Sequence, residues 1–348
     1  MNKIESLIYQ LRDTHSLTLS EYETLLCHRN PDTAGLLAAL ALVEKQKIYG
    51  NDIYIRGLIE VSNICKNDCY YCGIRRSNDR CDRYRLTAED ILACCAEGYE
   101  LGFRTFVMQG GEDGSFTDAF LVPLLREIKK RYPDCAITLS LGERSYDSYR
   151  QLKEAGADRY LLRHETADVE HYSKLHPASL SLENRMQCLR NLKTLGYQVG
   201  CGFMVGSPYQ TTEMLAKDLK FIETFRPDMC GIGPFIPHKD TPFRDFPAGD
   251  VELTCYLLSI LRLIQPTLLL PATTALGTLS ENGREKGILA GANVVMPNLS
   301  PTAVRRKYML YDNKLSDGAE SAQALASLRE RMERIGCRIA VARGDIIK

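Results

Sequence analysis

The chain lacks features that would place it in several common protein classes. No run of about 18 apolar residues occurs, and Met1–Tyr9 has the pattern of an amphipathic helix, which predicts neither a membrane span nor a signal peptide. Net charge is absent as well, because 44 basic residues balance 44 acidic ones. We therefore expect neither nucleic acid nor a membrane surface as a partner. No short repeat or low-complexity linker is present.

A disulfide framework is not expected either. The 13 cysteines are odd in number and irregularly spaced, and no signal peptide precedes them. This pattern predicts a reducing, cytoplasmic location. Four of the cysteines fall within helical patterns, where a free thiol packs as a small hydrophobic group, namely Cys94, Cys95, Cys188 and Cys255.

Three further cysteines form a compact motif. Cys65, Cys69 and Cys72 have the spacing C-x3-C-x2-C, with Tyr71 directly before the third, and they follow the strand-like run Ile53–Glu60. Thiolates select iron–sulfur clusters, zinc or copper(I), and a four-iron cubane usually takes four protein sulfurs. Three sulfurs would leave one iron open to a substrate or cofactor. We therefore predict an open iron–sulfur site.

Structural zinc is the alternative for this motif. A zinc site would need a fourth ligand, usually from a second Cys or His pair at fixed spacing. Cys81 lies nine residues after Cys72, and no such pair is evident. Zinc or redox-active cysteines are the less favoured interpretation.

The hydrophobic pattern predicts an α/β fold, a complete (β/α)8 TIM-type barrel with an N-terminal helical extension. Short β-branched runs alternate with amphipathic helices, which favours a parallel barrel over a doubly wound sheet. Strands are expected at 53–60, 105–109, 136–141, 159–163, 199–205, 229–233, 268–271 and 293–296. Helices are expected near 88–102, 118–131, 145–155, 182–195, 212–225, 250–264 and 284–290.

Three parts follow from this pattern. Residues 1–50 form a helical extension, in which 3–47 have the spacing of two or three helices, and residues 51–312 form the barrel. Residues 313–348 form a helical closing segment, in which 313–335 read as a charged amphipathic helix.

Polar residues gather at the predicted strand ends, where barrel enzymes place their chemistry. Met108–Asp113 contains two glycines, which let backbone approach a ligand closely, and the carboxylate of Glu112. Arg163–Thr166 places three strongly polar side chains in a row, which a buried strand end would not carry without water or a ligand to meet them. Thr138 and Ser140 share the face of their strand that points into the barrel.

Two other strand cysteines point the opposite way. Cys135 and Cys201 have the parity of side chains that face the helices, which lowers their value as ligands. The later strand ends are rich in Pro and Gly and poor in charge, as suits a site that shields a reactive intermediate from water.

Together these residues resemble the radical S-adenosylmethionine (SAM) superfamily and, within it, the HydE family of FeFe-hydrogenase maturases. The cysteine loop with its aromatic residue is the superfamily signature. Longer strings carry the closer resemblance, over roughly residues 50–312, namely Arg159–Ala167, Gly231–His238, Pro271–Ala275 and Ala290–Asn298.

The resemblance implies one 4Fe-4S cluster and SAM at the top of the barrel. The open iron would chelate the amino and carboxylate groups of SAM, and one electron would cleave the sulfonium to methionine and a 5′-deoxyadenosyl radical. Glu165 and Arg185 would hold SAM, with Arg185 suited to its carboxylate. The other expected cofactor-binding residues are Tyr71 and, beside the methionine amino group, Gln109, Gly110, Gly111 and Glu112.

The resemblance also implies a substrate and partners. The substrate would be a small organometallic iron complex with CO, cyanide and cysteine, processed toward the di-iron centre of FeFe-hydrogenase. Sibling maturases and a reductant protein would be partners. The cavity would be lined by Thr138, Ser140, Thr273, Thr274 and Tyr311, together with the expected catalytic residues Arg163, Met229 and Tyr308. Residues 312–323 lack the extra cysteines with which some family members bind a second cluster.

Other functions stay open at this stage. Biotin synthase and methylornithine synthase resemble this chain in barrel and radical step. A biotin synthase would need cysteines that face into the barrel and hold a sacrificial second cluster. A methylornithine-type mutase would differ from a hydrogenase maturase only in the residues that line the cavity. A non-enzymatic iron or zinc scaffold protein would bind metal without cleaving SAM.

Overall fold

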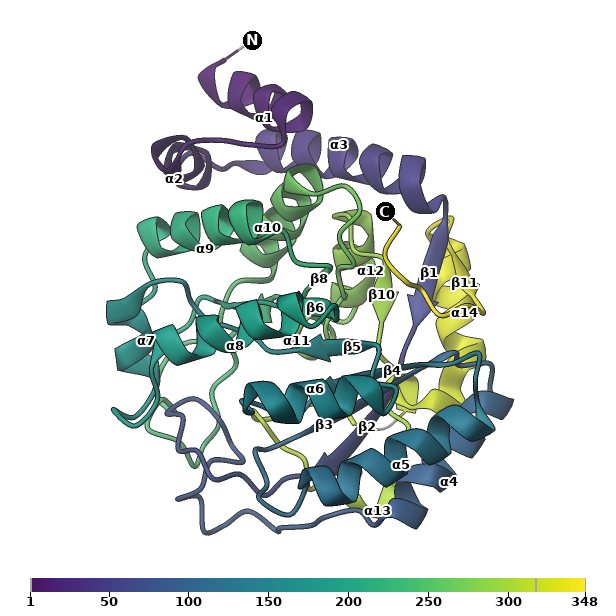
Figure 1. The fold of residues 1–348 in the computed structure, drawn as a ribbon. Coiled ribbons are helices and arrows are strands. Elements are labelled where there is room, and N and C mark those ends of the chain that lie inside the picture. Colours follow the sequence, from purple (N-terminus) through teal and green to yellow (C-terminus); the bar gives the residue numbers. More distant parts are fainter. Residues whose placement is uncertain (1, 317, 348) are drawn as a thin grey trace.

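A computed structural model of the chain describes residues 2–316 and 318–347. Its centre is a parallel sheet in the order β2-β3-β4-β5-β6-β8 (Figure 1). These strands are β2 (Gly57–Ser62), β3 (Thr105–Gly110), β4 (Ala136–Ser140), β5 (Arg159–Leu161), β6 (Gln198–Cys201) and β8 (Met229–Cys230). Two short strands continue β6 and β8 and pair with each other, namely β7 (Met204–Val205) and β9 (Gly233–Pro234).

Parallel bridges close this sheet into a ring. Met229 pairs with Leu269, and Pro271 pairs with Val294. Val294 belongs to β10 (Val294–Val295), which pairs with β1 (Asp52–Ile55), the segment directly before β2. Leu58 of β2 pairs with Asn298 to complete the circuit. The predicted barrel is thus confirmed, with the expected strand at 268–271 reduced to single bridges.

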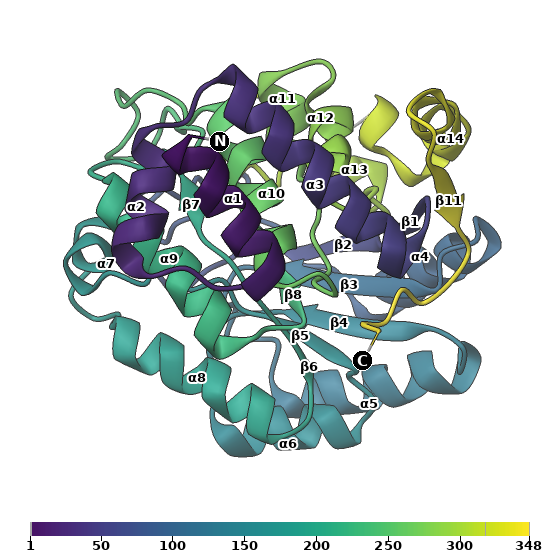
Figure 2. The same ribbon diagram turned by 90° about the horizontal axis from the view of Figure 1, so that it is seen from above.

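Helices surround the strands, as Figure 2 shows from above. Those that the sequence predicts are α4 (Ala88–Glu100), α5 (Asp118–Arg131), α6 (Tyr146–Glu154), α8 (Leu182–Thr194), α9 (Thr212–Phe225), α10 (Val251–Ile264) and α12 (Gly283–Leu289). Three short helices were not predicted, namely α7 (Val169–Leu175), α11 (Thr274–Leu279) and α13 (Thr302–Arg305). Each has seven residues or fewer, too few for a helical hydrophobic period to be recognised.

Local capping explains where the long helices begin. Thr87 accepts the N–H of Asp90 while the Asp90 carboxylate accepts the N–H of Thr87, a reciprocal pair that satisfies two free donors. Among the described residues, no helix combines the length and apolar character needed to cross a bilayer.

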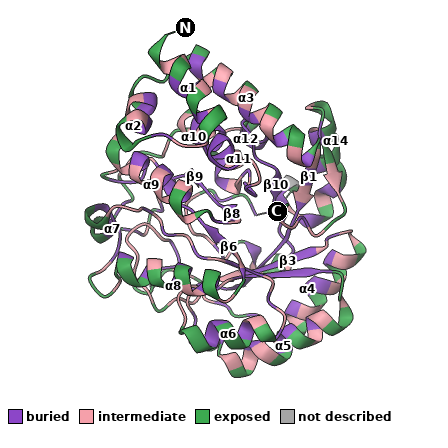
Figure 3. Cartoon of the chain, turned by 45° about the horizontal axis from the view of Figure 1, so that its top comes forward, coloured by how far each residue is buried: buried purple, intermediate pink, exposed green. Residues whose placement is uncertain are grey.

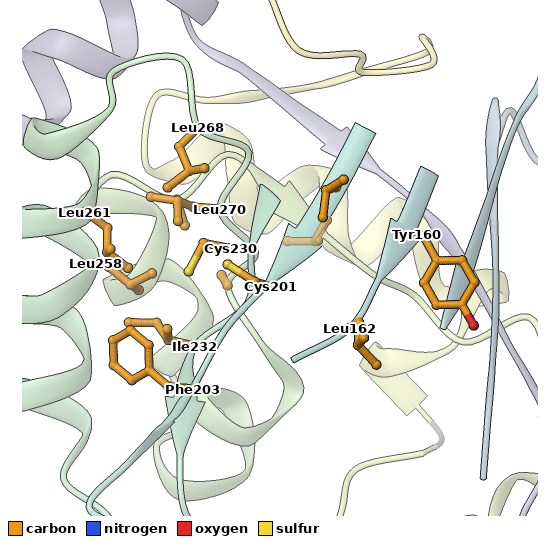
Figure 4. Packing of buried hydrophobic residues seen from close by; sticks show 14 of the residues in the cluster. Tyr160, Leu162, Cys201, Phe203, Cys230, Ile232, Leu258, Leu261, Leu268 and Leu270 are labelled. Carbon is orange, nitrogen blue, oxygen red and sulfur yellow. The ribbon is translucent and has the colours of Figure 1, made fainter. Parts of the chain in front are cut away.

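The core is an apolar layer between the strands and their helices (Figure 3). Cys201 and Cys230 lie in this layer, paired in register on β6 and β8 and fully buried. Figure 4 shows them among leucines of α10 and of residues 268–270. Cys201 therefore faces the helices, as its parity predicts, and Cys230 does the same.

The two ends of the chain pack on the barrel. The extension contains α1 (Lys3–Thr14), α2 (Leu19–Cys27) and α3 (Pro31–Tyr49), with α3 against α10 and α2 against α9. At the other end, β11 (Arg338–Ala340) pairs with β1.

The closing segment is less helical than the sequence predicts. Its α-helix, α14, spans only Leu325–Arg334, preceded by two 3-10 turns at Gly318–Glu320 and Ala322–Ala324. The preceding segment is irregular, and its Lys314 is buried and lines the cavity at the barrel mouth. Tertiary contacts, which the helical pattern does not report, override the local pattern here.

Candidate active site

A cavity of about 350 Å³ opens at the carboxyl ends of the strands. Residues from around the whole ring line it. Of the residues expected from the sequence, the lining includes Cys65, Cys69, Tyr71, Cys72, Gln109, Gly110, Gly111, Glu112, Ser140, Arg163, Glu165, Arg185, Thr273, Thr274, Tyr308 and Tyr311. A larger groove of about 680 Å³ between α3, α10 and α12 contains none of these residues.

Two expected residues lie outside this lining. Met229 is buried and its sulfur accepts a hydrogen bond from Arg56 at 2.9 Å. Thr138 is also buried, and its hydroxyl has no hydrogen-bond partner. Both are deeper in the barrel than the cavity.

The cysteine loop is fixed by close backbone contacts. The Glu112 N–H donates to the Cys65 sulfur at 3.4 Å, and the Lys66 N–H donates to the Glu112 carbonyl at 3.0 Å. A Cβ on Gly111 would lie 2.3 Å from the carbonyl oxygen of Ile64. Only glycine therefore lets the end of β3 pack against this loop.

The cysteine side chains suit a cluster better than a single ion. Among the described residues, no three His, Cys, Asp or Glu side chains converge on one metal position. Zinc requires such convergence at about 2.3 Å, whereas a cubane binds its thiolates on separate irons. Burial raises the pKa of all three thiols, that of Cys69 to about 12, so the thiolate form requires a bound cation.

Tyr71 is held from behind by a buried histidine. Nδ1 of His176 lies 3.0 Å from the Tyr172 carbonyl, to which it must donate, so Nε2 accepts the Tyr71 hydroxyl at 3.2 Å. The His176 ring also stacks on Tyr172 with centroids 3.9 Å apart. Burial lowers the pKa of His176 to about 3, so the ring is neutral at pH 7.

We expect His176 to contribute a pH-dependent term to stability. The unfolded side chain binds a proton near pH 6.5, whereas the folded one does so only near pH 3. Acidification between these values therefore favours the unfolded state, by up to about 1.4 kcal/mol per pH unit. The free energy of unfolding, measured with urea between pH 7 and pH 4, should fall less steeply with pH in His176→Asn than in the wild type. An identical slope would contradict a neutral, buried His176.

Glu112 and Arg185 are positioned by residues after β4. A Cβ on Gly142 would lie 1.9 Å from Glu112 Cγ, so only glycine leaves room for this carboxylate. Glu112 Oε1 accepts the Glu143 N–H at 3.0 Å. Arg185 Nε lies 2.7 Å from Glu143 Oε1, an ion pair without the angle of a hydrogen bond. The Arg185 guanidinium therefore keeps donor capacity at the cavity wall.

Glu165 occupies a constrained turn after β5. Its φ of 67° is left-handed, which is uncommon for a residue other than glycine. Asp218 of α9 holds this turn through the Ala167 N–H at 2.6 Å and through His164 Nε2 at 3.3 Å. The Gly202 N–H donates to His164 Nδ1 at 3.3 Å, so the proton of this neutral ring is on Nε2. This buried support presents the Glu165 carboxylate to the cavity.

Several buried polar atoms at this site have no hydrogen-bond partner. They are Thr138 Oγ1, Arg163 Nε and Thr273 Oγ1. Arg163 Nη2 and Glu165 Oε2 also lack a hydrogen bond but lie 3.3 Å apart as an ion pair, as Arg185 Nε does with Glu143 at 2.7 Å. Unpaired buried polar atoms are costly, so a polar ligand that pairs with them would be stabilised. The mixed set of guanidinium, carboxylate and hydroxyl groups fits the charged amino acid part of SAM and a polar substrate.

The sequence reading missed the buried pair Glu60 and Lys314. Lys314 Nζ lies 2.7 Å from Glu60 Oε1, and Asn298 Nδ2 donates to Glu60 Oε2 at 2.9 Å. Lys314 also lies over the Tyr308 ring, 5.4 Å from its centroid, and both charged residues line the cavity. A carboxylate inside the apolar strand 53–60 was the signal for Glu60, whereas nothing local marks Lys314.

Comparisons with known proteins agree with this geometry. Residues 59–222 match the Radical SAM superfamily. The [FeFe] hydrogenase maturase subunit HydE of Thermotoga maritima is 43% identical over 292 residues, 84% of this chain and 83% of that protein. The 3-methylornithine synthase of Methanosarcina barkeri is 28% identical over 98% of this chain and 95% of that protein.

Solved structures share the fold. Methylornithine synthase (PylB) superposes with a TM-score of 0.84 at 28% identity, covering 96% of this chain and 97% of that chain. The maturase HydG from Carboxydothermus hydrogenoformans superposes with a TM-score of 0.81 over 97% of this chain and 79% of that chain, at 20% identity.

The barrel, its three-cysteine loop and these matches define the chain as a radical SAM enzyme. Enzymes of this superfamily use a 4Fe-4S cluster and SAM, and the three-cysteine loop fits that cluster. Within the superfamily, the chain belongs to the family of the FeFe-hydrogenase maturase subunit HydE.

We expect Arg185 to act on SAM binding and not on cluster assembly. Arg185→Ala should retain its iron content but bind SAM more weakly by about 1.5–3 kcal/mol, the scale of a charged hydrogen bond. Arg190→Ala is the matched control, because Arg190 lies on the same helix but is exposed and pairs with Glu183. Anaerobic titration of the reconstituted protein with SAM measures both. Unchanged affinity in Arg185→Ala would exclude a direct contact.

Proposed function

We propose that this enzyme reductively cleaves SAM and acts in the assembly of the di-iron active site of FeFe-hydrogenase. The observation that carries this proposal is the three-cysteine loop opening on a polar cavity in a chain 43% identical to HydE. When bound, the cluster and SAM supply one-electron cleavage of a carbon–sulfur bond to give a 5′-deoxyadenosyl radical. The protein's own residues bind, orient and shelter the reactants.

Cys65, Cys69 and Cys72 would hold the cluster through their thiolates. Arg185 would pair with the SAM carboxylate, because its donors face the cavity while Glu143 fixes its stem. Glu165 and the 109–112 segment would receive the SAM amino group and ribose hydroxyls, since carboxylates and backbone carbonyls accept hydrogen bonds from both. Tyr71, fixed by His176, would cover the ligand from the loop side.

The lower part of the cavity would take the organometallic iron substrate. Ser140, Thr273 and Thr274 lie in the cavity wall, and the hydroxyl groups of Ser140 and Thr273 could donate to cyanide or carboxylate groups of such a complex. The Thr274 hydroxyl donates to Glu320 at 3.3 Å and would line the substrate region. Tyr308 and Arg163 would act as the catalytic residues. Both line the cavity, and the Gln109 amide donates to the Tyr308 hydroxyl at 3.5 Å. Tyr311, Thr138 and Met229 would complete the substrate region, the last two beneath the cavity floor.

The expected partners are sibling hydrogenase maturases and a reductant protein in the cytoplasm. A small organometallic complex is reactive, so its transfer between maturases would require contact between them. The reductant protein would supply the electron that SAM cleavage consumes.

A methylornithine-type mutase is the second candidate. The fold similarity to methylornithine synthase, with a TM-score of 0.84 over 96% of this chain, favours it. Its sequence identity of 28% is well below the 43% to HydE, which favours the maturase.

Anaerobic reconstitution tests both parts of the proposal. The enzyme should form 5′-deoxyadenosine from SAM after reduction, and it should be required to activate an apo-hydrogenase in a mixture of maturases. Formation of 5′-deoxyadenosine with no effect on hydrogenase activation, and with formation of 3-methylornithine, would favour the mutase. Metal binding without any SAM cleavage would indicate a scaffold protein.

A further inference from the structure

A buried lysine and a buried cysteine meet where the two ends of the chain pack together. The buried face of α3 repeats every four residues and consists of Thr33, Leu37, Ala41, Lys45 and Tyr49. Cys337 lies in the turn between α14 and β11. The carboxyl-terminal end of α3 lies next to β1 and β11 in both Figure 1 and Figure 2. The fold therefore places a primary amine on the buried face of α3, opposite a thiol.

The amine of Lys45 has this thiol as its hydrogen-bond partner. Nζ donates to Cys337 Sγ at 3.8 Å, and no ion pair joins Lys45 to any residue that the structure describes. Lys45 is 0% exposed. A buried ammonium ion without a carboxylate is costly, which favours the neutral amine. Burial lowers the pKa of Lys45, the Cys337 thiol partly offsets this, and Arg262 lowers it again. The neutral amine is the nucleophilic form.

Cys337 lies close to the surface, although it is itself only 6% exposed. Its chain neighbours Gly336 and Arg338 are both exposed. It directly precedes β11, a three-residue strand at the edge of the sheet β10-β1-β11. Local opening of such a short edge segment costs less free energy than global unfolding. A brief opening would admit a molecule as small as hydrogen peroxide.

We propose that Lys45 and Cys337 form a modification site, at which hydrogen peroxide joins the two side chains through a nitrogen–sulfur bond. Peroxide first oxidises the thiol to a sulfenic acid and is itself reduced, with release of one water. The Lys45 nitrogen then attacks the sulfenic sulfur and the S–O bond breaks. The hydroxyl group leaves as a second water, with one hydrogen from the amine. The product is a sulfenamide, in which the sulfur has lost two electrons to the peroxide.

The link is reversible and lies apart from the active site. A thiol reductant restores the amine and the thiol and is itself oxidised to a disulfide. The link would tie the N-terminal extension to the last strand of the chain, across 292 positions of sequence. Neither residue lines the cavity, so cross-linking is independent of the proposed function, and either can fail without the other.

Peptide mapping tests the proposal. The full chain, before cluster reconstitution and with a metal chelator present, is treated with hydrogen peroxide. It is then denatured with N-ethylmaleimide to block free thiols and digested with trypsin, which does not cleave after a modified lysine. The expected product is residues 30–47 joined to residues 335–338, with two hydrogen atoms fewer than the sum of the two peptides. Dithiothreitol should separate the two peptides.

Two variants are matched controls. Lys45→Met lacks the amine, so its Cys337 should go on to the sulfinic acid, with a gain of two oxygen atoms and no cross-link. Lys47→Arg removes a primary amine from the exposed side of the same helix, where Lys47 pairs with Glu44, and keeps the charge and the trypsin site. It should give the same yield of cross-link as the wild type.

Peroxide treatment in urea shows whether the fold is needed. Unfolding separates the two side chains, so no cross-link should form. An equal yield of cross-link in urea would overturn the proposal. So would a folded wild type in which Cys337 stays a thiol or becomes a sulfinic acid while trypsin cleaves normally after Lys45.

Discussion

Replacement of Cys65, Cys69 or Cys72 by alanine, one at a time, should abolish both the cluster and SAM cleavage. Each thiolate would bind a separate iron of the cubane, so that three thiolates would leave one iron open for SAM. Iron analysis, visible absorbance and 5′-deoxyadenosine formation after anaerobic reconstitution measure the loss.

Cys81→Ala is the matched control for these variants. Cys81 is the next cysteine along the chain, it does not line the cavity, and its sulfur is 3.5 Å from the Asn63 amide. This variant should keep about four irons per chain. A cysteine-loop variant with a full cluster and normal SAM cleavage would disprove the assignment.

The same iron count tests the prediction of a single cluster. Cys201 and Cys230 lie in the apolar layer between the barrel and α10, away from the cavity. An iron content clearly above four per chain, lost in Cys230→Ala, would contradict this placement.

Lys314→Met should destabilise the fold by about 3–5 kcal/mol. Glu60 is fully buried, and Lys314 is the cation nearest to its carboxylate, at 2.7 Å. Removal of the lysine leaves a buried charge that, within residues 2–316 and 318–347, retains a side-chain hydrogen bond from Asn298 alone. Urea unfolding of the apo-protein measures this change apart from any effect on the cluster.

Two further variants separate charge burial from loss of packing. Glu60→Gln/Lys314→Met removes both charges and keeps an acceptor for Asn298, so it should recover a large part of the lost stability. Lys307→Met removes a half-exposed ion pair with Asp82 and should cost less than about 1 kcal/mol. If the double variant loses as much free energy of unfolding as Glu60→Gln and Lys314→Met lose in sum, the two residues are not coupled.

The fold class could be predicted from the sequence, and so could the three cysteines that we propose as cluster ligands. Both depend on information that is local in the chain. Strand and helix periods alternate from residue 51 onward, and the three cysteines lie within eight residues of one another. The inward parity of Ser140 and the outward parity of Cys201 followed from the two-residue repeat of a strand, and the structure places both side chains accordingly. The glycines at the end of the strand predict a close approach to a ligand, whereas the close approach at Gly111 is to the carbonyl of Ile64.

Only the folded structure shows which residues far apart in the sequence meet at the site. Lys314 reaches Glu60 across 254 positions of sequence, and Asp218 supports the turn of Glu165 through His164, 54 positions away. The identity of a residue does not reveal such partners, because a lysine or aspartate that is buried and paired cannot be told from an exposed one in the sequence. The closing segment illustrates the same limit. The sequence pattern predicts helix over 313–335, whereas the α-helix begins only at Leu325, and Lys314 before it pairs with the buried Glu60. Such tertiary contacts are not visible in a local helical pattern.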